Sequence, residues 1–371
     1  MIELKKVSKK FKEKVILKDV SIKFEDNNIT CLIGESGCGK TTILKMINRL
    51  IKPTSGDIFI DKENIKDKDV IKLRRSIGYV IQQTGLFPHM TIKDNIELIS
   101  KIEKRPKKFI NERIYEVMDM IGLDNSLLER YPTELSGGQQ QRIGIARAFF
   151  TNPNIILMDE PFSALDPITR CALQDELLQL QEQYHKTIIF VTHDMDEAIK
   201  MADKIIIMDK GEIIQYGTPE EILKNPKNDF VKEFVGNDRI WTSPQYIKIE
   251  DIMMKNLITA RPSHSCFYCL NKMKMNKVDN LLMINNQNKF IGVLYAEMLN
   301  GINYDNKMAE EYIDTDIIVI NPRDSIVDVL EKINENDITI IPVVNDNNVL
   351  VGYITKGILL TFLSQQFVGD E

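Results

Sequence analysis

Short runs of β-branched and aliphatic residues alternate with helical patterns over about the first 240 residues of the chain. Continuous apolar runs of strand length predict buried strands at Ile29–Ile33, Ile155–Met158 and Thr187–Val191. After the first of these runs and a glycine-rich turn, apolar residues recur at helical spacing from Ile43 to Leu50. Strands that alternate with helices in this way predict an α/β domain with a largely parallel sheet.

A different pattern follows a cluster of breaking residues at 241–244. The C-terminal part carries an internal repeat with an offset of 60 residues, so that Pro262 aligns with Pro322 and Gly292 with Gly352. Each copy predicts a helix, an apolar strand, an asparagine-rich turn and a second strand. We therefore expect an α/β domain at 1–240, a linker at 241–250, and two similar α+β units at 251–307 and 308–367.

Composition narrows the function classes. The chain has 371 residues and a formal net charge of −6, so no overall positive field draws in nucleic acid, and none is expected as the main partner. No segment approaches the ~18 uninterrupted apolar residues that cross a bilayer, and the first residues lack the apolar stretch of a signal peptide. We expect a cytosolic chain that reaches a membrane only through a partner.

The five cysteines are too few for a disulfide framework in so long a chain, which fits a reducing compartment. Only Cys266 and Cys269 have a spacing that suggests a metal site. The 60-residue offset aligns them with Ile326 and Val329, which are apolar positions of the equivalent helix. Because a zinc site would also need further ligands, this alignment predicts core packing and no metal.

A phosphate-binding loop stands between the first buried strand and the helix that follows it. Its glycines let several backbone N–H groups and the helix N-terminus point at one anion. Lys40 adds a charge for the β- and γ-phosphates, and Thr41 offers a hydroxyl to Mg²⁺. Cys38 is interpreted as a small loop residue. The predicted ATP-binding residues of this loop are Gly34, Glu35, Ser36, Gly37, Cys38, Gly39, Lys40, Thr41 and Thr42.

Two further motifs carry chemistry. The strand that ends in Asp159 and Glu160 suits Mg²⁺ coordination by the first carboxylate and activation of water by the second. The sequence from Leu135 to Gln139 begins a helix and again offers backbone N–H groups to an anion. An ordinary helix cap is the alternative interpretation of this second motif.

Together with 163–166 and 192–194, these motifs resemble the ATPase subunit of an ABC transporter over about 240 residues. The resemblance implies a P-loop NTPase cassette, with a RecA-like core and a helical subdomain, that uses ATP and Mg²⁺. It implies that Phe11 stacks on adenine, that Gln82 touches Mg²⁺ and water, and that His193 contacts the γ-phosphate. Asp166 takes the place of the D-loop aspartate. The implied metal residues are Thr41, Gln82 and Asp159.

The resemblance also implies partners. In this family the signature residues complete the ATP site of the opposite subunit, which implies a head-to-tail homodimer; here they are Ser136, Gly137, Gly138 and Gln139. The stretch from Gln82 to about Tyr131 looks like the helical subdomain that docks a membrane permease. Expected partners are therefore integral membrane permease subunits and an external solute-binding protein. The chain itself is expected to be peripheral, at the cytoplasmic face of the plasma membrane.

The C-terminal repeats resemble paired CBS domains, which often bind adenine nucleotides between their copies. Cassettes with such a pair resemble the ATPases of glycine betaine, carnitine and choline importers. The family's adenosine-binding pattern has an aspartate after Gly-x-Ile-Thr, but Lys356 follows Thr355 here and Tyr295 replaces the threonine in the first copy. This departure disfavours a mononucleotide. The resemblance to CBS-bearing osmolyte importers suggests instead a two-fold ligand, cyclic di-AMP, which would suit the symmetric cleft of paired domains from two subunits. The expected pocket comprises Val278, Leu282, Ile338, Thr339, Ile340 and Pro342.

Three alternatives stay open from the sequence, and a fourth is disfavoured. The importer could carry another small solute, because solute recognition belongs to the permease and the binding protein. The chain could instead be a soluble nucleotide sensor whose ATPase is secondary, and the repeats could serve dimerisation alone. A cassette that acts on DNA or ribosomes would call for a long coiled coil, tandem cassettes or a basic surface, and the sequence shows none of these.

Overall fold

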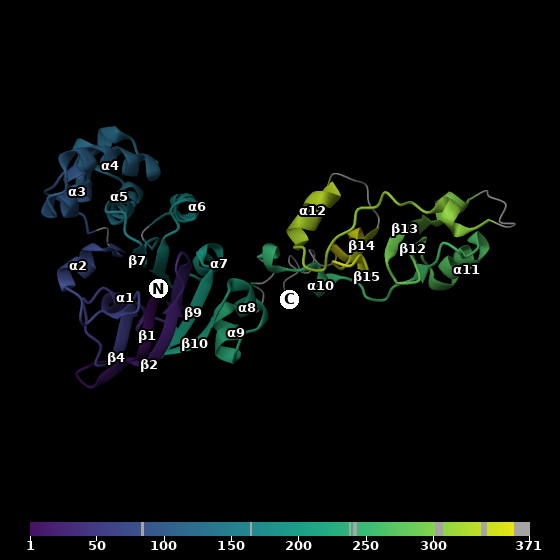
Figure 1. The fold of residues 1–371 in the computed structure, drawn as a ribbon, viewed down its shortest axis with the longest axis horizontal. Coiled ribbons are helices and arrows are strands. Elements are labelled where there is room, and N and C mark those ends of the chain that lie inside the picture. The colour runs from purple at the N-terminus through teal and green to yellow at the C-terminus, as the bar shows by residue number, and fades with distance from the viewer. Residues whose placement is uncertain are drawn as a thin grey trace. The chain divides into compact units, whose positions relative to one another are not determined.

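The computed structural model describes residues 1–82, 85–163, 165–236, 239, 243–300, 307–334 and 340–359. It divides into two compact units, Met1–Gly236 and Asn237–Glu371 (Figure 1). Unit 1 holds the predicted α/β domain, and unit 2 holds the predicted repeats.

The central sheet of unit 1 is largely parallel, as predicted. It consists of β3 (Ile29–Gly34), β6 (Ile77–Val80), β7 (Ile155–Asp159), β8 (Thr187–Val191), β9 (Lys204–Asp209) and β10 (Glu212–Gly217). Their order is β10-β9-β3-β8-β7-β6, and only β10 runs antiparallel to its neighbour. Every residue of β3, β7 and β8 is buried, because both faces of these strands are covered.

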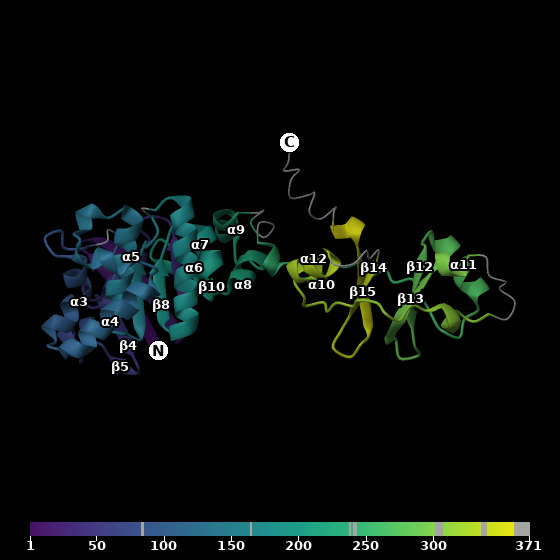
Figure 2. The ribbon, with the colours of Figure 1, turned by 90° about the horizontal axis from the view of Figure 1, so that it is seen from above.

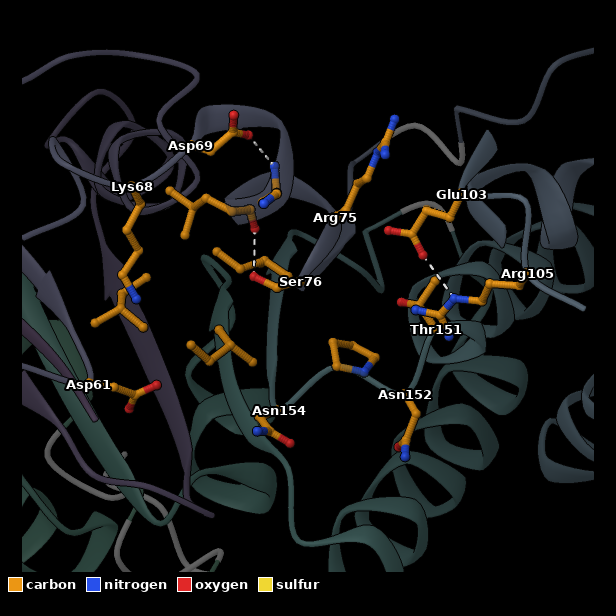
Figure 3. A pocket seen from close by; sticks show the side chains of 16 residues that line it. Asp61, Lys68, Asp69, Arg75, Ser76, Glu103, Arg105, Thr151, Asn152 and Asn154 are labelled. Atoms are coloured by element: carbon orange, nitrogen blue, oxygen red, sulfur yellow. Dashed lines mark hydrogen bonds and ion pairs between the residues drawn. The ribbon is translucent and has the colours of Figure 1, made fainter. Parts of the chain in front are cut away.

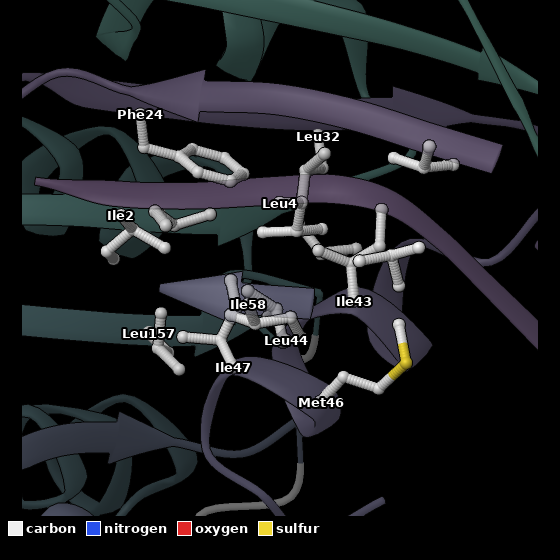
Figure 4. Close-up of a cluster of buried hydrophobic side chains, with 14 of the residues drawn as sticks. Ile2, Leu4, Phe24, Leu32, Ile43, Leu44, Met46, Ile47, Ile58 and Leu157 are labelled. Carbon is white, nitrogen blue, oxygen red and sulfur yellow. The ribbon is translucent and has the colours of Figure 1, made fainter. Parts of the chain in front are cut away.

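A second, antiparallel sheet of unit 1 was not predicted. It contains β1 (Ile2–Phe11), β2 (Lys14–Phe24), β4 (Ser55–Ile60) and β5 (Glu63–Asn64), in the order β2-β1-β4-β5. One face of these strands is buried and the other is exposed. Their apolar residues are therefore fewer than in the central sheet and are separated by lysines. An apolar core lies between the two sheets (Figure 4) and contains Ile2, Leu4, Phe24, Leu32, Ile43, Ile47, Ile58 and Leu157.

The helices of unit 1 are α1 (Lys40–Ile47), α2 (Val70–Arg75), α3 (Ile92–Ile102), α4 (Lys107–Met120), α5 (Gly137–Phe150), α6 (Pro167–Tyr184), α7 (Met195–Met201), α8 (Pro219–Lys224) and α9 (Asp229–Val235). Helices α3, α4 and α5 pack together, at the end of unit 1 opposite α8 and α9 (Figure 2). Arg113 of α4 donates to the carbonyls of Phe149 and Phe150 and so caps the C-terminus of α5. Within the ranges described, no helix is long and apolar enough to cross a membrane.

Unit 2 contains α10 (Ile249–Ile252), β11 (Thr259–Ala260), α11 (Cys266–Asn276), β12 (Asn280–Ile284), β13 (Phe290–Tyr295), α12 (Ile326–Asn334), β14 (Ile340–Val344) and β15 (Leu350–Thr355). Helix α12 and strands β14 and β15 each begin 60 residues after α11, β12 and β13. The caps repeat as well: the hydroxyl of Ser265 accepts from the N–H of Tyr268, and that of Ser325 from the N–H of Asp328. The internal repeat is therefore a repeat of structure.

The two copies exchange their leading segments. Met254, at the start of the first copy, pairs with Tyr353 of β15, while Asp314, at the start of the second, pairs with Val293 of β13. Ile249 is fully buried in the core of the second copy. The end of the predicted linker 241–250 is thus packed into the second copy, because its apolar side chains complete that core.

The turns of the two copies also meet. The N–H of Phe290 donates to the carbonyl of Asn348 at 3.0 Å, and the N–H of Leu350 donates to the carbonyl of Asn288 at 3.2 Å. Asn288 and Asn348 have φ of 57° and 58°, a left-handed conformation that asparagine tolerates better than most residues. These contacts relate the copies by an approximate two-fold axis.

Candidate active site

The loop between β3 and α1 can be built only with glycine at two of its positions. A Cβ on Gly34 would lie 2.1 Å from the carbonyl oxygen of Met208, and one on Gly39 would lie 2.5 Å from Cδ2 of Leu17. Both glycines also have positive φ, 151° and 110°. Gly37 has no atom within 4 Å of such a Cβ, so this side of the loop is open. The loop is a curled backbone cradle with room on one side.

Lys40 places a cation in this cradle. Its Nζ donates to the carbonyls of Gly34 at 2.7 Å and Glu35 at 2.9 Å, and the residue is only 7% exposed. Cys38 is buried behind the loop, where desolvation raises the pKa of its thiol. A buried ammonium group and the first turn of α1 are the kind of groups that can bind an anion.

The hydroxyl of Thr41 donates to Oδ1 of Asp159 at 2.7 Å, which brings the ends of α1 and β7 together. Among the described residues, no three or more histidine, cysteine or acidic side chains are grouped so that they alone could hold a metal ion. This donor set fits Mg²⁺, because that ion uses one or two carboxylate or hydroxyl oxygens together with phosphate and water. Thr41 and Asp159 are therefore the side chains that would hold it.

Glu160, Gln82 and His193 converge beside this pair. Nε2 of Gln82 donates to Oε2 of Glu160 at 2.9 Å, and Nδ1 of His193 lies 3.6 Å from the same oxygen. The φ of Glu160 is 46°, and its N–H donates to the carbonyl of Val191 at 3.0 Å, so β8 holds it in a strained conformation. Gln82 and His193 thus meet at the carboxylate of Glu160, and each of the three predicted residues follows a different strand.

The predicted signature residues lie apart from this group. Ser136 caps α5, since its Oγ accepts from the N–H of Gln139 at 3.3 Å and its own N–H donates to Oε1 of Gln139 at 3.0 Å. A Cβ on Gly138 would lie 2.7 Å from Cγ2 of Thr169, so α5 approaches α6 closely there. Among the described residues, no hydrogen bond or ion pair joins 136–139 to the loop or to Glu160.

The remaining predicted residues are placed as follows. Asp166 caps α6 by accepting from the N–H of Thr169 at 3.1 Å, which lowers the pKa of its carboxyl group. Phe11 ends β1 and is 45% exposed, with Nζ of Lys9 4.6 Å from its ring centroid. Glu35 and Ser36 are exposed, and Thr42 is half-buried on α1. Ala164 of the predicted D-loop lies outside the described residues.

A cavity of about 420 Å³ lies between the copies in unit 2. Val278, Leu282 and Ile340 line it as predicted, whereas Pro342 is not among its lining residues, and Ile338 and Thr339 lie outside the described part of the chain. The other lining residues are Ile258, Lys277, Asp279, Asn280, Tyr353 and Thr355.

Sequence reasoning missed Arg170 and Glu197. Arg170 projects from α6 toward Glu197 of α7, and both lie beside the loops that carry Asp166 and His193. The only signal in the sequence is their spacing, since each stands four residues after a predicted site residue, within one turn of the following helix.

Family comparisons agree with both units. The family model described as "ABC transporter" matches residues 17–163, and the one described as "CBS domain" matches 249–299 and 309–365. The solved ATP-binding cassette MJ0796, in a dimeric post-hydrolysis state bound to ADP and Pi, is 36% identical with a TM-score of 0.54 and covers 59% of this chain and 99% of its own. The fold predicted from the sequence is thereby confirmed.

Curated relatives match the whole chain. The glycine betaine/carnitine/choline transport ATP-binding protein OpuCA of Bacillus subtilis is 45% identical over 100% of this chain and 98% of its own length. The carnitine transport ATP-binding protein OpuCA of Listeria monocytogenes is 44% identical over 100% and 94%. The chain therefore belongs to the family of CBS-bearing ABC transporter ATP-binding proteins that includes these two relatives.

Proposed function

We propose that this chain is the ATP-hydrolysing subunit of an importer for the quaternary amines glycine betaine, carnitine and choline. The observation that carries the activity is the meeting of Gln82 and His193 on one oxygen of Glu160, next to Thr41 and Asp159. The full-length similarity to transport proteins for these solutes supports the substrate class. ATP and Mg²⁺ are the proposed cofactors.

The residues divide the work of hydrolysis. The backbone N–H groups of 34–42 and the ammonium group of Lys40 donate hydrogen bonds to the phosphates, and Phe11 stacks on the adenine ring. Thr41, Asp159 and Gln82 would hold Mg²⁺, which would neutralise phosphate charge. Glu160 polarises the attacking water and takes up its proton, while His193 donates a hydrogen bond to the γ-phosphate.

A homodimer completes the site in this proposal. Ser136 and Gln139 stand at an open helix N-terminus that makes no described contact with the phosphate-binding loop of its own chain. In a head-to-tail pair, residues 136–139 of one subunit and the loop 34–42 of the other enclose one nucleotide. The dimeric state of the similar cassette MJ0796 supports this arrangement.

A groove in unit 1 suits a cytoplasmic loop of a permease. It has a volume of about 710 Å³ and receives residues from α2, from the segment after α3 and from the turn between α5 and β7 (Figure 3). Glu103 and Arg105, an ion pair at 2.8 Å, face Lys68 and Asp69 across it. A loop bound here touches the core and the helical region together. This docking would hold the chain at the cytoplasmic face of the plasma membrane, with a solute-binding protein outside.

The repeats form a regulatory site in the same proposal. The proposed domains are the cassette at 1–240, the linker at 241–250 and the two CBS domains at 251–307 and 308–367. The cavity between the copies is in the size range of small-molecule pockets, with apolar walls at Leu282 and Ile340 for adenine and Lys277 at its rim for a phosphate. Two such cavities in a dimer of chains would take the two halves of cyclic di-AMP.

Reconstitution tests the function. The chain, its permease and its binding protein are placed in proteoliposomes, and uptake of labelled glycine betaine, carnitine and choline is measured with ATP inside. We expect uptake that Glu160→Gln abolishes. ATP hydrolysis without uptake of any of the three would assign the importer to another solute.

Calorimetry tests the regulatory site separately. The full-length Lys40→Ala variant is titrated with cyclic di-AMP, because its ATP site is weakened while unit 2 is unchanged. We expect saturable binding of cyclic di-AMP by this variant. We also expect slower uptake when cyclic di-AMP is added to the reconstituted wild-type transporter. No heat together with unchanged uptake would leave dimerisation as the role of the repeats.

A further inference from the structure

One side chain joins the two loops that flank the active-site carboxylate. Arg170 of α6 donates from a terminal nitrogen to the carbonyl oxygen of Leu165 at 3.0 Å. Its other terminal nitrogen lies 3.7 Å from Oδ2 of Asp194, and its Nε lies 3.8 Å from Oε1 of Glu197. The guanidinium group therefore bridges the segment after Glu160 and the segment after β8.

On one side, the bridge ends on two carboxylates, Asp194 and Glu197, that fix the backbone around His193. Glu197 is only 6% exposed, and its Oε2 accepts from the hydroxyl of Thr192 at 2.6 Å. The same hydroxyl accepts from the N–H of Asp194 at 3.0 Å, and the carboxylate of Asp194 caps α7. His193 stands between these two residues, so both of its neighbours are tied to Glu197 or to α7.

On its other side, Arg170 reaches the segment that leaves the active site. Leu165 directly precedes Asp166, the cap of α6, and is buried. Ser163, two residues earlier, donates from its hydroxyl to the carbonyl of Glu160 at 3.1 Å. A shift of this segment would therefore disturb two contacts, the one with the backbone of Glu160 and the one with Arg170.

The bridge is partly desolvated. Nε of Arg170 is buried and has no hydrogen-bond partner within the described ranges, so Glu197 is its nearest anion. A charged donor shielded from water interacts more strongly with nearby carboxylates than an exposed one. Arg170 can therefore hold the two loops in one arrangement, whereas an exposed surface pair would contribute little.

We infer that Arg170 is a positioning residue for ATP hydrolysis, which sets His193 and the 163–166 segment in register with each other. The inference rests on the proposed roles of Glu160 and His193. In the described part of the chain, Arg170 makes no hydrogen bond or ion pair with the phosphate-binding loop, which includes Thr41, so its loss should reduce turnover and leave nucleotide binding intact. Because a lysine has no planar fork, it can keep the charge but not all three contacts.

A general packing role for the same helices predicts something different. Lys200 of α7 also bridges to α6, since its Nζ lies 2.7 Å from the carboxylate of Asp175 and 3.5 Å from the carbonyl of Cys171. This bridge joins the same two helices away from both loops. Lys200→Ala is therefore the matched control for Arg170→Ala.

Steady-state ATP hydrolysis by the full chain assembled with its permease separates the two roles. We expect Arg170→Ala to lower kcat by about 10-fold to 100-fold, with KM for ATP within about two-fold of wild type. Lys200→Ala should keep kcat within about two-fold of wild type. Arg170→Lys should be intermediate and serves as the variant to interpret if Arg170→Ala folds poorly. Equal losses in Arg170→Ala and Lys200→Ala would overturn the inference.

The decisive measurement is made in a His193→Ala background, with single-turnover hydrolysis of labelled ATP. If Arg170 acts through His193, Arg170→Ala adds less than about a three-fold loss to His193→Ala. The full loss on top of His193→Ala would show independent effects and reject the positioning role. Absence of turnover in the wild-type assembly would instead reject the proposed function.

Discussion

The hydroxyl of Thr41 and the carboxylate of Asp159 are hydrogen-bonded at 2.7 Å, although 117 residues separate them in the chain. Their contact joins the first turn of α1 to the end of β7 and gives the site two hard oxygen ligands side by side. An ion could bind these two oxygens without a change in the backbone, because the two side chains are already in contact.

This contact predicts a specific metal defect. Asp159→Asn should raise the Mg²⁺ concentration for half-maximal ATP hydrolysis by about 10-fold or more, because an amide oxygen is a weaker ligand than a carboxylate. Thr41→Ser keeps the hydroxyl and is the matched control, with an expected change below about two-fold. A magnesium titration of the hydrolysis rate at saturating ATP decides, and an unaltered titration for Asp159→Asn would remove it from the metal site.

Glu160 and Lys40 should fail in different ways. Glu160→Gln keeps its shape and its contact with Gln82 but cannot accept a proton, so we expect a loss in kcat of about 100-fold or more with ATP binding retained. Lys40→Ala removes the buried cation and should weaken binding itself. Equilibrium binding of labelled ATP and single-turnover hydrolysis separate the two. Normal single-turnover rates in Glu160→Gln would assign water activation elsewhere.

The strands and loops that could be predicted are those whose local chemistry leaves little choice. The apolar runs of β3, β7 and β8 are buried on both faces, and the glycines at 34 and 39 stand where any Cβ would collide. The antiparallel sheet of β1, β2, β4 and β5 was missed because its half-exposed strands are rich in lysine and carry a weak pattern. The register shifts between β1 and β2 interrupt the alternation of apolar and polar residues, so the sequence pattern does not reveal these strands.

The site was predictable one residue at a time, but its connections were not. Gln82, Glu160 and His193 each carried a motif, whereas their shared contact depends on three strand ends that only the sheet order brings together. Arg170 carried no motif at all. Its role depends on a bridge between α6 and α7, and a spacing of four residues is too common in helices to mark one.

The cysteines should differ sharply in reactivity. Cys266 and Cys269 are fully buried, and burial raises the pKa of Cys269 to about 11, so little thiolate is present near neutral pH. Cys31 and Cys38 are also buried, while Cys171 is exposed. We expect one fast-reacting thiol in the native protein with a disulfide reagent, five after denaturation, and none fast in Cys171→Ser.

The same cysteines predict the metal content of the purified protein. Cys266 and Cys269 pack with Met273 and Leu281 in the core of the first copy, without a histidine or carboxylate cluster in the described residues. Metal analysis should therefore find no stoichiometric zinc. Zinc that disappears on Cys266→Ser would contradict this prediction.

Gly292 marks a close approach between the copies of unit 2. A Cβ there would lie 2.1 Å from the carbonyl oxygen of Asp314, so Gly292→Ala must push the exchanged segment away. We expect a loss of about 1–3 kcal/mol in the free energy of unfolding of unit 2. In Gly357→Ala the new methyl would meet only Oγ1 of Thr355 at 3.7 Å, so denaturant unfolding should change little. Equal stability of the two variants would contradict the close packing.

A charge reversal tests the groove. Arg105→Glu should reduce recovery of the permease with the chain by about 10-fold, because Arg105 lines the groove and would become a second carboxylate beside Glu103. Lys232→Glu, on the exposed side of α9, is the matched control for charge. ATP binding by the isolated chain should be unchanged in both. Full recovery of the permease with Arg105→Glu would place docking outside the groove.

The exchange of leading segments in unit 2 has a consequence for how such chains can evolve. Since β13 pairs with Asp314 and β15 with Met254, neither half can be deleted or transplanted without exposing an edge of the other. The pair is inherited or lost as one module. Within it, the two reciprocal contacts at Asn288 and Asn348 are backbone hydrogen bonds, and Nδ2 of Asn348 adds a side-chain donor, to the carbonyl of Phe290 at 3.2 Å. Pocket side chains can therefore diverge between the halves while the architecture persists. New ligand preferences can therefore arise by substitution in one half alone.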